Sequence, residues 1–130
     1  MKNLRTHRDL KVWSKSIKLV TSIYQLTKRF PKEELYCLTS QIRRSAISIP
    51  SNIAEGAARS SVKEFRNFLS ISLGSASELE TQIVISNNLN YLNQSQADII
   101  LTELTEIQKM IHGLRKSLTE KDKNKYTGSK

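Results

Sequence analysis

The stretch that most constrains this chain is Tyr36–Gly56, with the sequence YCLTSQIRRSAISIPSNIAEG. Apolar side chains recur at a spacing close to three and four residues at Leu35, Leu38, Ile42, Ile49 and Ile53, with Ser45 at the one missing step, which places them on one face of an α-helix. Pro50 lies inside this pattern, has no N–H to donate and crowds the carbonyl of Ala46. Because the apolar rhythm keeps its phase across Pro50, we predict one continuous helix that is kinked at the proline.

Similar apolar periodicity predicts three further helices, so that the four helices span 10–30, about 33–58, 62–89 and 95–118. Pro31 ends the first of them, since proline biases the residue before it away from helix. Ser61 with Glu64, and Ser95 with Asp98, have the spacing of capping boxes that open the third and fourth helices.

Four helices joined by short loops predict an all-α fold, an antiparallel up-down-up-down four-helix bundle over residues 1–118. Residues 119–130, TEKDKNKYTGSK, lack an apolar period, and we expect a disordered polar tail there. The single cysteine, Cys37, excludes an intrachain disulfide and fits a reducing cytoplasm. We find no signal peptide and no apolar run long enough to span a membrane, so a cytoplasmic protein without membrane contact is expected.

The first helix carries two apolar seams about 110° apart. The first seam consists of Leu10, Trp13, Ile17, Val20 and Tyr24, and the second of Val12, Leu19, Ile23, Leu26 and Phe30. Two seams favour a helix that is buried on two sides, either inside its own bundle or against another subunit. A single wide face turned toward the core is an equally good interpretation.

The third helix contains the small-residue segment SISLGSAS, and Gly74 within it predicts close approach of another helix backbone, because glycine is costly in a helix interior. Glu78 and Glu80 of this helix are candidate partners for Arg43 and Arg44 of the second. We expect a structural ion pair for Arg44, and leave open whether Arg43 is structural or faces a phosphate.

The formal charge of +9 is concentrated at the start of the chain. Residues 1–32 hold nine basic residues and one acidic residue, whereas residues 33–119 hold eight basic and nine acidic residues. Spacings of three and four align a basic ridge on the first helix, made of Arg8, Lys11, Lys15 and Lys18 and assisted by Arg5 and Arg29. Such a ridge predicts a polyanionic partner, although basic surfaces also serve solubility.

Catalytic patterns are missing from the sequence. Neither His7 nor His112 has the Glu three residues earlier that di-metal bundle sites use, and no phosphate loop, GxSxG or His-Glu-x-x-His motif occurs. We therefore expect no cofactor, no metal and no catalytic residue, and a protein that is not an enzyme.

A set of motifs resembles a bacterial family of four-helix bundle proteins, the 23S rRNA intervening-sequence proteins. These motifs are Leu10–Trp13, Tyr36, Gln41–Ser45, Ser48–Gly56, Lys63–Phe65, Phe68–Leu69, Gly74–Ser75 and Glu78–Glu80. The resemblance covers nearly all of the chain up to Leu118. One departure is Ser72, where the family pattern would have alanine.

The resemblance implies a small cytoplasmic bundle that assembles as a homopentameric ring. It also implies a relation to the accessory variability proteins of diversity-generating retroelements, which share the bundle, the ring and a basic surface and bind nucleic acid and a reverse transcriptase. The biochemical role of the intervening-sequence family itself is poorly defined.

Two hypotheses follow. The first is a non-enzymatic, homo-oligomeric nucleic-acid-binding bundle, with RNA as the expected ligand, in which Arg5, Arg8, Lys11, Lys15, Lys18 and Arg29 contact phosphates. The alternative is a protein-interaction scaffold that docks an acidic protein partner such as a polymerase or reverse transcriptase.

Overall fold

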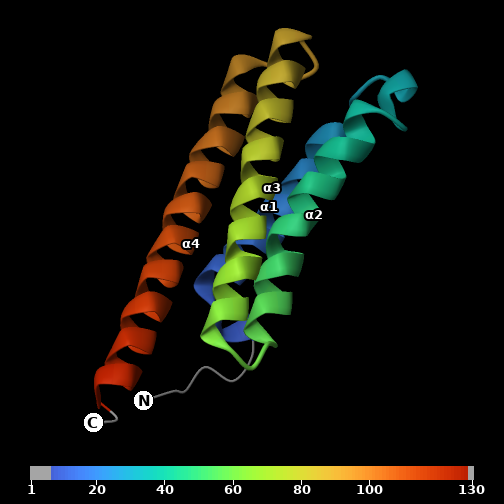
Figure 1. The fold of residues 1–130 in the computed structure, drawn as a ribbon. Helices are drawn as coiled ribbons and strands as arrows, with labels where there is room; N and C mark the ends of the chain where they lie inside the picture. Colours follow the sequence, from blue (N-terminus) through green and yellow to red (C-terminus); the bar gives the residue numbers. More distant parts are fainter. Residues whose placement is uncertain (1–6, 129–130) are drawn as a thin grey trace.

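The computed structural model describes residues 7–128, and these residues form four α-helices and no strand. The helices are α1 (Lys11–Thr27), α2 (Leu38–Ala57), α3 (Val62–Asn88) and α4 (Gln94–Gly128), and short 3₁₀ turns lie at His7–Asp9 and Lys32–Glu34. The chain reverses direction from each helix to the next (Figure 1). This all-helical arrangement is consistent with the predicted four-helix bundle. No helix in the described part of the chain is long and apolar enough to cross a membrane.

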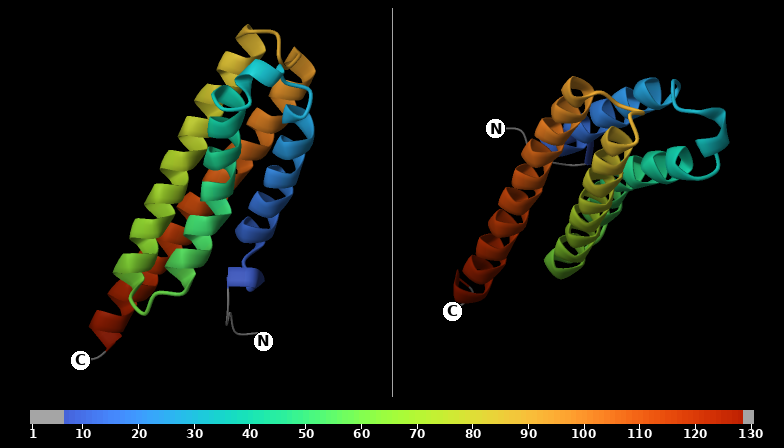
Figure 2. Two further views of the ribbon diagram at one scale, coloured as in Figure 1. Left: turned by 90° about the vertical axis from the view of Figure 1, so that its right-hand side faces the viewer. Right: turned by 90° about the horizontal axis from the view of Figure 1, so that it is seen from above.

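The helices pack as neighbours in the order of the sequence. The contact between α2 and α3 is the most extensive, and α1 lies against α2 while α4 lies against α3 (Figure 2). The contact that would close the bundle, between α1 and α4, is the smallest of the four. The side between α1 and α4 is therefore the most open side of the molecule.

Leucine and isoleucine build the core, as the low aromatic content requires. The largest fully buried side chains are Leu19, Ile23, Ile42, Ile49, Ile53, Leu69, Leu79, Ile83, Ile100, Leu104, Ile107 and Ile111. The second seam of α1 supplies Leu19 and Ile23, whereas the first seam is only partly covered, and its members Ile17 and Tyr24 are 39% and 36% exposed. Within one chain, α1 is thus buried on one seam and half-buried on the other.

Pro50 lies inside α2, and the helix continues across it, as predicted. The kink stays a prediction. Hydroxyl groups link α2 and α3 beside the proline: Ser72 Oγ donates to the carbonyl of Ile49 at 2.9 Å, and Ser75 Oγ donates to Ser48 Oγ at 2.8 Å. Ser72, the position that departs from the family pattern, therefore forms a buried contact between the two helices.

The two helical glycines of this hairpin have different surroundings. A Cβ on Gly56 would lie 2.8 Å from Phe68 Cβ, so Gly56 permits close packing where α2 turns into α3. Gly74 is exposed, and a Cβ there would meet nothing within 4 Å. The prediction that another helix of the chain approaches Gly74 is therefore wrong for the described residues, because the small-residue surface at that position faces outward.

Helix boundaries differ from the predictions where turn geometry intervenes. The first helix ends at Thr27 rather than Phe30, and α2 starts at Leu38, after a 3₁₀ turn at the expected start. At the start of α2, the carboxylate of Glu34 accepts a hydrogen bond from the Leu38 N–H at 3.4 Å. The same carboxylate accepts from Tyr91 Oη at 2.9 Å, and this hydrogen bond raises the pKa of Tyr91.

The capping predictions divide. Ser61 caps α3 and accepts from the Glu64 N–H at 3.1 Å, as expected. The predicted cap of α4 is misplaced, because Asn93 and Gln96 cap that helix reciprocally: the Gln96 N–H donates to Asn93 Oδ1 at 2.8 Å, and the Asn93 N–H donates to Gln96 Oε1 at 3.0 Å. An amide pair can make the same two bonds that a serine and an acid make in a capping box.

The end of α4 also differs from expectation. The helix continues to Gly128, where the sequence predicts a disordered tail from residue 119. The segment 119–127 contains neither proline nor glycine, and its lysine and glutamate residues have good helix propensity. Helix propensity thus extends α4 beyond the last apolar residue of its period.

Candidate nucleic-acid interface

The four residues of the basic ridge line one groove on the open side of the molecule. The 3₁₀ turn before α1 brings Arg8 into line with Lys11, Lys15 and Lys18, whose spacings of four and three place them on one stripe of the helix. The groove has a volume of about 480 Å³ and is completed by Leu10, Ser14, Glu106 and Met110. Four cationic side chains therefore face a common space between α1 and α4.

Lys15 forms an ion pair across the groove. Its Nζ lies 2.7 Å from Glu106 Oε2 of α4, and both side chains are partly exposed. The hydrogen bond and charge of Glu106 raise the pKa of Lys15, and the same pairing lowers the pKa of Glu106. This ion pair joins the two helices across the groove and neutralises one charge of the ridge.

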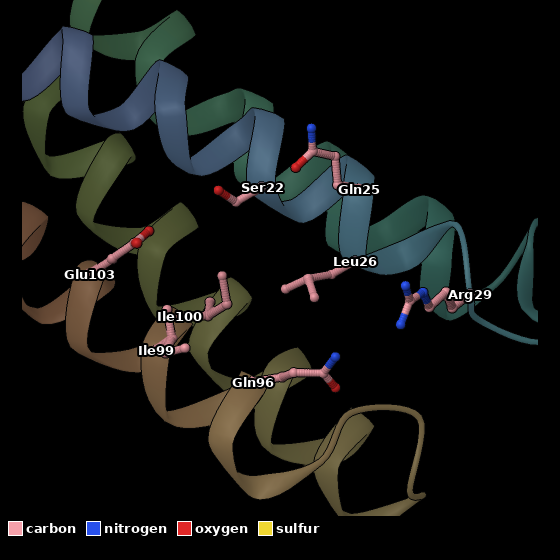
Figure 3. A pocket seen from close by; sticks show the side chains of 8 residues that line it. All are labelled: Ser22, Gln25, Leu26, Arg29, Gln96, Ile99, Ile100 and Glu103. Carbon is pink, nitrogen blue, oxygen red and sulfur yellow. The ribbon is translucent and has the colours of Figure 1, made fainter.

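The other two predicted site residues lie elsewhere. Arg5 is outside the described residues. Arg29 lies near the opposite end of α1 and lines a second cavity of about 380 Å³ between α1 and α4. Figure 3 shows Leu26 of α1 facing Ile99 and Ile100 of α4 in this cavity, with Arg29 and Gln96 toward one end. The structure therefore groups Arg8, Lys11, Lys15 and Lys18 but leaves Arg29 apart from them.

Arg43 is held by α1. Its Nε donates to Thr27 Oγ1 at 2.9 Å, and its guanidinium lies over the Tyr24 ring at 4.6 Å from the centroid. These contacts favour the structural interpretation of Arg43, which the sequence leaves open. Arg44 is exposed and makes no ion pair within 4.0 Å with any residue of 7–121, so the expected pairing with Glu78 or Glu80 is not formed.

Two features near the start of α2 have no counterpart in the sequence predictions. A wide groove of about 610 Å³ between α1 and α2 is lined by Tyr24, Leu35, Tyr36 and Ile47, together with Ser40, Arg43, Arg44 and Ser48. The Tyr36 side chain is 90% exposed at its edge. The sequence signal for this groove is the placement of Tyr36 and Ile47 on the flank of the apolar stripe to which Leu35 belongs.

Among the residues that the structure describes, no three His, Cys, Asp or Glu side chains gather in a way that could hold a metal ion. His7 instead packs its ring against Trp13, with 4.9 Å between the centroids.

Comparison with known proteins identifies relatives. Residues 8–113 match the sequence model of a family described as 23S rRNA-intervening sequence protein. The fold is similar to the crystal structure of a protein of unknown function from the S23 ribosomal protein family of Bacteroides thetaiotaomicron, with a TM-score of 0.75 and 30% sequence identity over 81% of this chain and 98% of that chain. A search of curated proteins gives no match.

Proposed function

The chain belongs to the family of 23S rRNA-intervening sequence proteins, and from this premise we propose that it is a non-enzymatic, cytoplasmic RNA-binding protein. The observation that carries the proposal is the groove between α1 and α4, where Arg8, Lys11, Lys15 and Lys18 face one space. A stripe of cationic side chains without a helix placed to contact base edges favours contacts to phosphates over recognition of the nucleotide sequence.

The proposed unit of binding is a homo-oligomeric ring. The half-exposed first seam of α1, with Ile17 and Tyr24 on the surface, supports a second copy packing there. The number five rests on the family resemblance alone. Several grooves on one ring would combine weak phosphate contacts into a higher overall affinity.

The test measures binding of a fluorescent single-stranded RNA by anisotropy as a function of salt. Each phosphate neutralised on a single strand contributes about −0.7 to the slope of log affinity against log salt, so three or four contacts per subunit predict a slope of about −2 to −3. The double reversal Lys11→Glu/Lys18→Glu is expected to abolish binding, because both lysines line the groove.

The matched control is Lys63→Glu/Lys116→Glu, which changes the net charge equally at exposed positions outside the groove. We expect this control to retain most of the affinity. Equal losses in the two double variants would show that net charge and not the groove drives binding, and no binding of the wild-type chain at low salt would overturn the proposal.

A second candidate function is a scaffold for an acidic protein partner such as a polymerase or reverse transcriptase. The groove between α1 and α2 favours it, because exposed apolar side chains lie beside Arg43 and Arg44 there. This function would be supported if the chain captures a protein partner, if the capture persists after nuclease treatment, and if the variant Ile47→Glu no longer captures the partner. Capture that nuclease abolishes would count against it.

A further inference from the structure

A pocket between α2 and α3 is lined entirely by residues with polar side-chain groups. Its volume is about 370 Å³, which lies in the range of small-molecule sites. From α2 and the residues before it come Tyr36, Ser40, Gln41, Arg44 and Ser45, and from α3 come Glu78 and Gln82. It lies across the molecule from the basic groove, since it is formed by the other pair of helices.

The polar groups of this pocket are not used by the fold. No hydrogen bond or ion pair joins any of these seven side chains to another residue of the described chain, although serines one turn away are bonded across the same helix pair. Gln82 is nine-tenths buried, and its Oε1 has no donor among the described residues. A buried acceptor without a donor is costly, and rotation of this amide about its broad terminal torsion could turn it to a ligand.

The two walls of the pocket differ in chemistry. The α3 wall offers acceptors, the Glu78 carboxylate and the Gln82 amide oxygen, whereas the α2 wall offers the Arg44 guanidinium as a donor. A matching ligand has two adjacent donors on one edge and acceptors on another. The Tyr36 ring, 90% exposed at the rim, provides a face on which a planar ligand could stack.

Guanine has this arrangement among the nucleobases. Its N1–H and N2–H₂ groups are adjacent donors, and its O6 and N7 are acceptors that arginine recognises in pairs. In adenine and cytosine the exocyclic amine stands next to a ring nitrogen that is an acceptor, and uracil offers one ring N–H between two carbonyl oxygens, so none presents two adjacent donor atoms to Glu78 and Gln82. Stacking of unpaired bases on aromatic side chains is a common mode of recognition.

We propose that the pocket between α2 and α3 binds one guanine base, stacked on Tyr36 with Glu78 and Gln82 at its Watson–Crick edge and Arg44 at O6 and N7. The base could belong to a free guanosine nucleotide or to an unpaired nucleotide of an RNA. Because the pocket and the basic groove are formed by different helix pairs, this site does not depend on the RNA contacts proposed for α1.

The first arm of the test titrates the full-length protein with GMP, AMP, CMP and UMP by calorimetry. We expect wild type to bind GMP about ten-fold more tightly than AMP, CMP or UMP, because a pair of hydrogen bonds discriminates one base from the others by this order of magnitude. Glu78→Gln and Tyr36→Ala should each weaken GMP binding by roughly ten-fold, through loss of an acceptor and of the stacking face.

The matched control is Glu80→Gln, two residues along the same helix, exposed and outside the pocket. It should bind GMP as wild type does. Three results would each overturn the proposal: equal binding of GMP and AMP, equal losses in Glu78→Gln and Glu80→Gln, or no nucleotide binding at millimolar concentration. We expect the absence of all nucleotide binding if a side chain of a partner protein fills the pocket.

The second arm compares a U-only RNA nonamer with the same RNA carrying one central G, in wild type and in Lys11→Glu/Lys18→Glu. A G-dependent gain in affinity that Glu78→Gln removes identifies RNA as the source of the base. GMP binding without such a gain identifies a free nucleotide. If Lys11→Glu/Lys18→Glu loses RNA binding but still binds GMP, the guanine site is shown to be distinct from the basic groove.

Discussion

Gly56 sets how closely α2 and α3 approach at the turn between them. A Cβ at this position would lie 2.9 Å from Phe65 Cδ1 and 3.2 Å from the Phe65 carbonyl oxygen, besides its contact with Phe68 Cβ. Two of these three neighbours are close to the backbone, so α3 itself must shift to admit the methyl group. Gly74, on the outward face of the same hairpin, has no such constraint.

We predict opposite effects of alanine at these two glycines. Gly56→Ala is expected to lower the free energy of unfolding by about 1–2 kcal/mol, since overpacking outweighs the gain in helix propensity. Gly74→Ala should raise it by about 0.5–1 kcal/mol, because only the propensity term acts. Urea denaturation measures both values, and a gain for Gly56→Ala would contradict the close approach.

Asn90 ends α3 in the left-handed conformation, with φ of 64°. The Tyr91 N–H donates to the Ser86 carbonyl at 2.9 Å and the Asn90 N–H to the Asn87 carbonyl at 3.0 Å, which are the two bonds of a Schellman motif. Only glycine and, to a lesser extent, asparagine adopt this conformation easily.

Asn90→Ala is therefore expected to destabilise the fold by about 1 kcal/mol, whereas Asn90→Gly should retain the wild-type stability or slightly exceed it. Thermal unfolding of the two variants side by side checks the pair. Equal destabilisation by alanine and glycine would indicate that the asparagine side chain matters more than its backbone conformation.

At the scale of elements, one ion pair couples α1 to α4. Glu106 neutralises Lys15 within the basic groove, so its removal has opposite consequences for folding and for the proposed RNA binding. Glu106→Gln should bind RNA more tightly than wild type, since the groove gains a net positive charge. Glu80→Gln has the same charge change outside the groove, and its RNA affinity should rise less.

The same pair predicts a pH dependence. The pKa of Glu106 is lowered from 4.5 in the folded protein. The ionised carboxylate therefore stabilises the fold above pH 4.5, and this stabilisation is lost as the pH falls through the pKa of the folded state. The pKa of Lys15 is raised from 10.5, so its contribution is present below pH 10.5 and is lost as the pH rises through the folded value. The difference in urea midpoint between wild type and Glu106→Gln should be constant near neutral pH and shrink at acidic pH.

The helices and their buried faces could be predicted because one periodicity dictates both. Ile42, Ile49 and Ile53 lie on one apolar stripe in the sequence and are all fully buried. Contacts between helices could not be predicted in this way, because spacing along one helix contains no information about what faces it. The Lys15–Glu106 pair and the bond from Arg43 to Thr27 both join positions on different helices.

The site shows the same division. Alignment of Arg8, Lys11, Lys15 and Lys18 follows from local spacing, and the structure places all four on one groove. Arg29 fits the same stripe in the sequence, but the length of α1 separates it from them. Of the polar pocket between α2 and α3, the sequence indicates only that Arg44 lies near Glu78. The pocket itself does not follow from spacing, because its two walls are about 35 residues apart in the chain and meet only through packing.

For the whole molecule, the exposed first seam of α1 leads to a prediction about assembly. Light scattering of wild type should give a mass above that of the 14.8 kDa chain, and Ile17→Asp should reduce it to the mass of one chain, because a charge would have to be buried in the contact. Ile99→Asp places the same charge at an exposed isoleucine of α4 and should leave the assembly intact. A wild-type monomer, or dissociation by Ile99→Asp alone, would contradict the assignment to α1.

The unequal packing of the four helices also bears on how the chain acquires its fold. The most extensive contact, between α2 and α3, joins segments that are adjacent in sequence, whereas α1 and α4 must meet across the length of the chain. Local contacts close at a lower entropic cost than distant ones. We therefore expect a central hairpin that forms first and recruits the two outer helices onto it, and amide hydrogen exchange should show the slowest protons in α2 and α3 and earlier opening of α1.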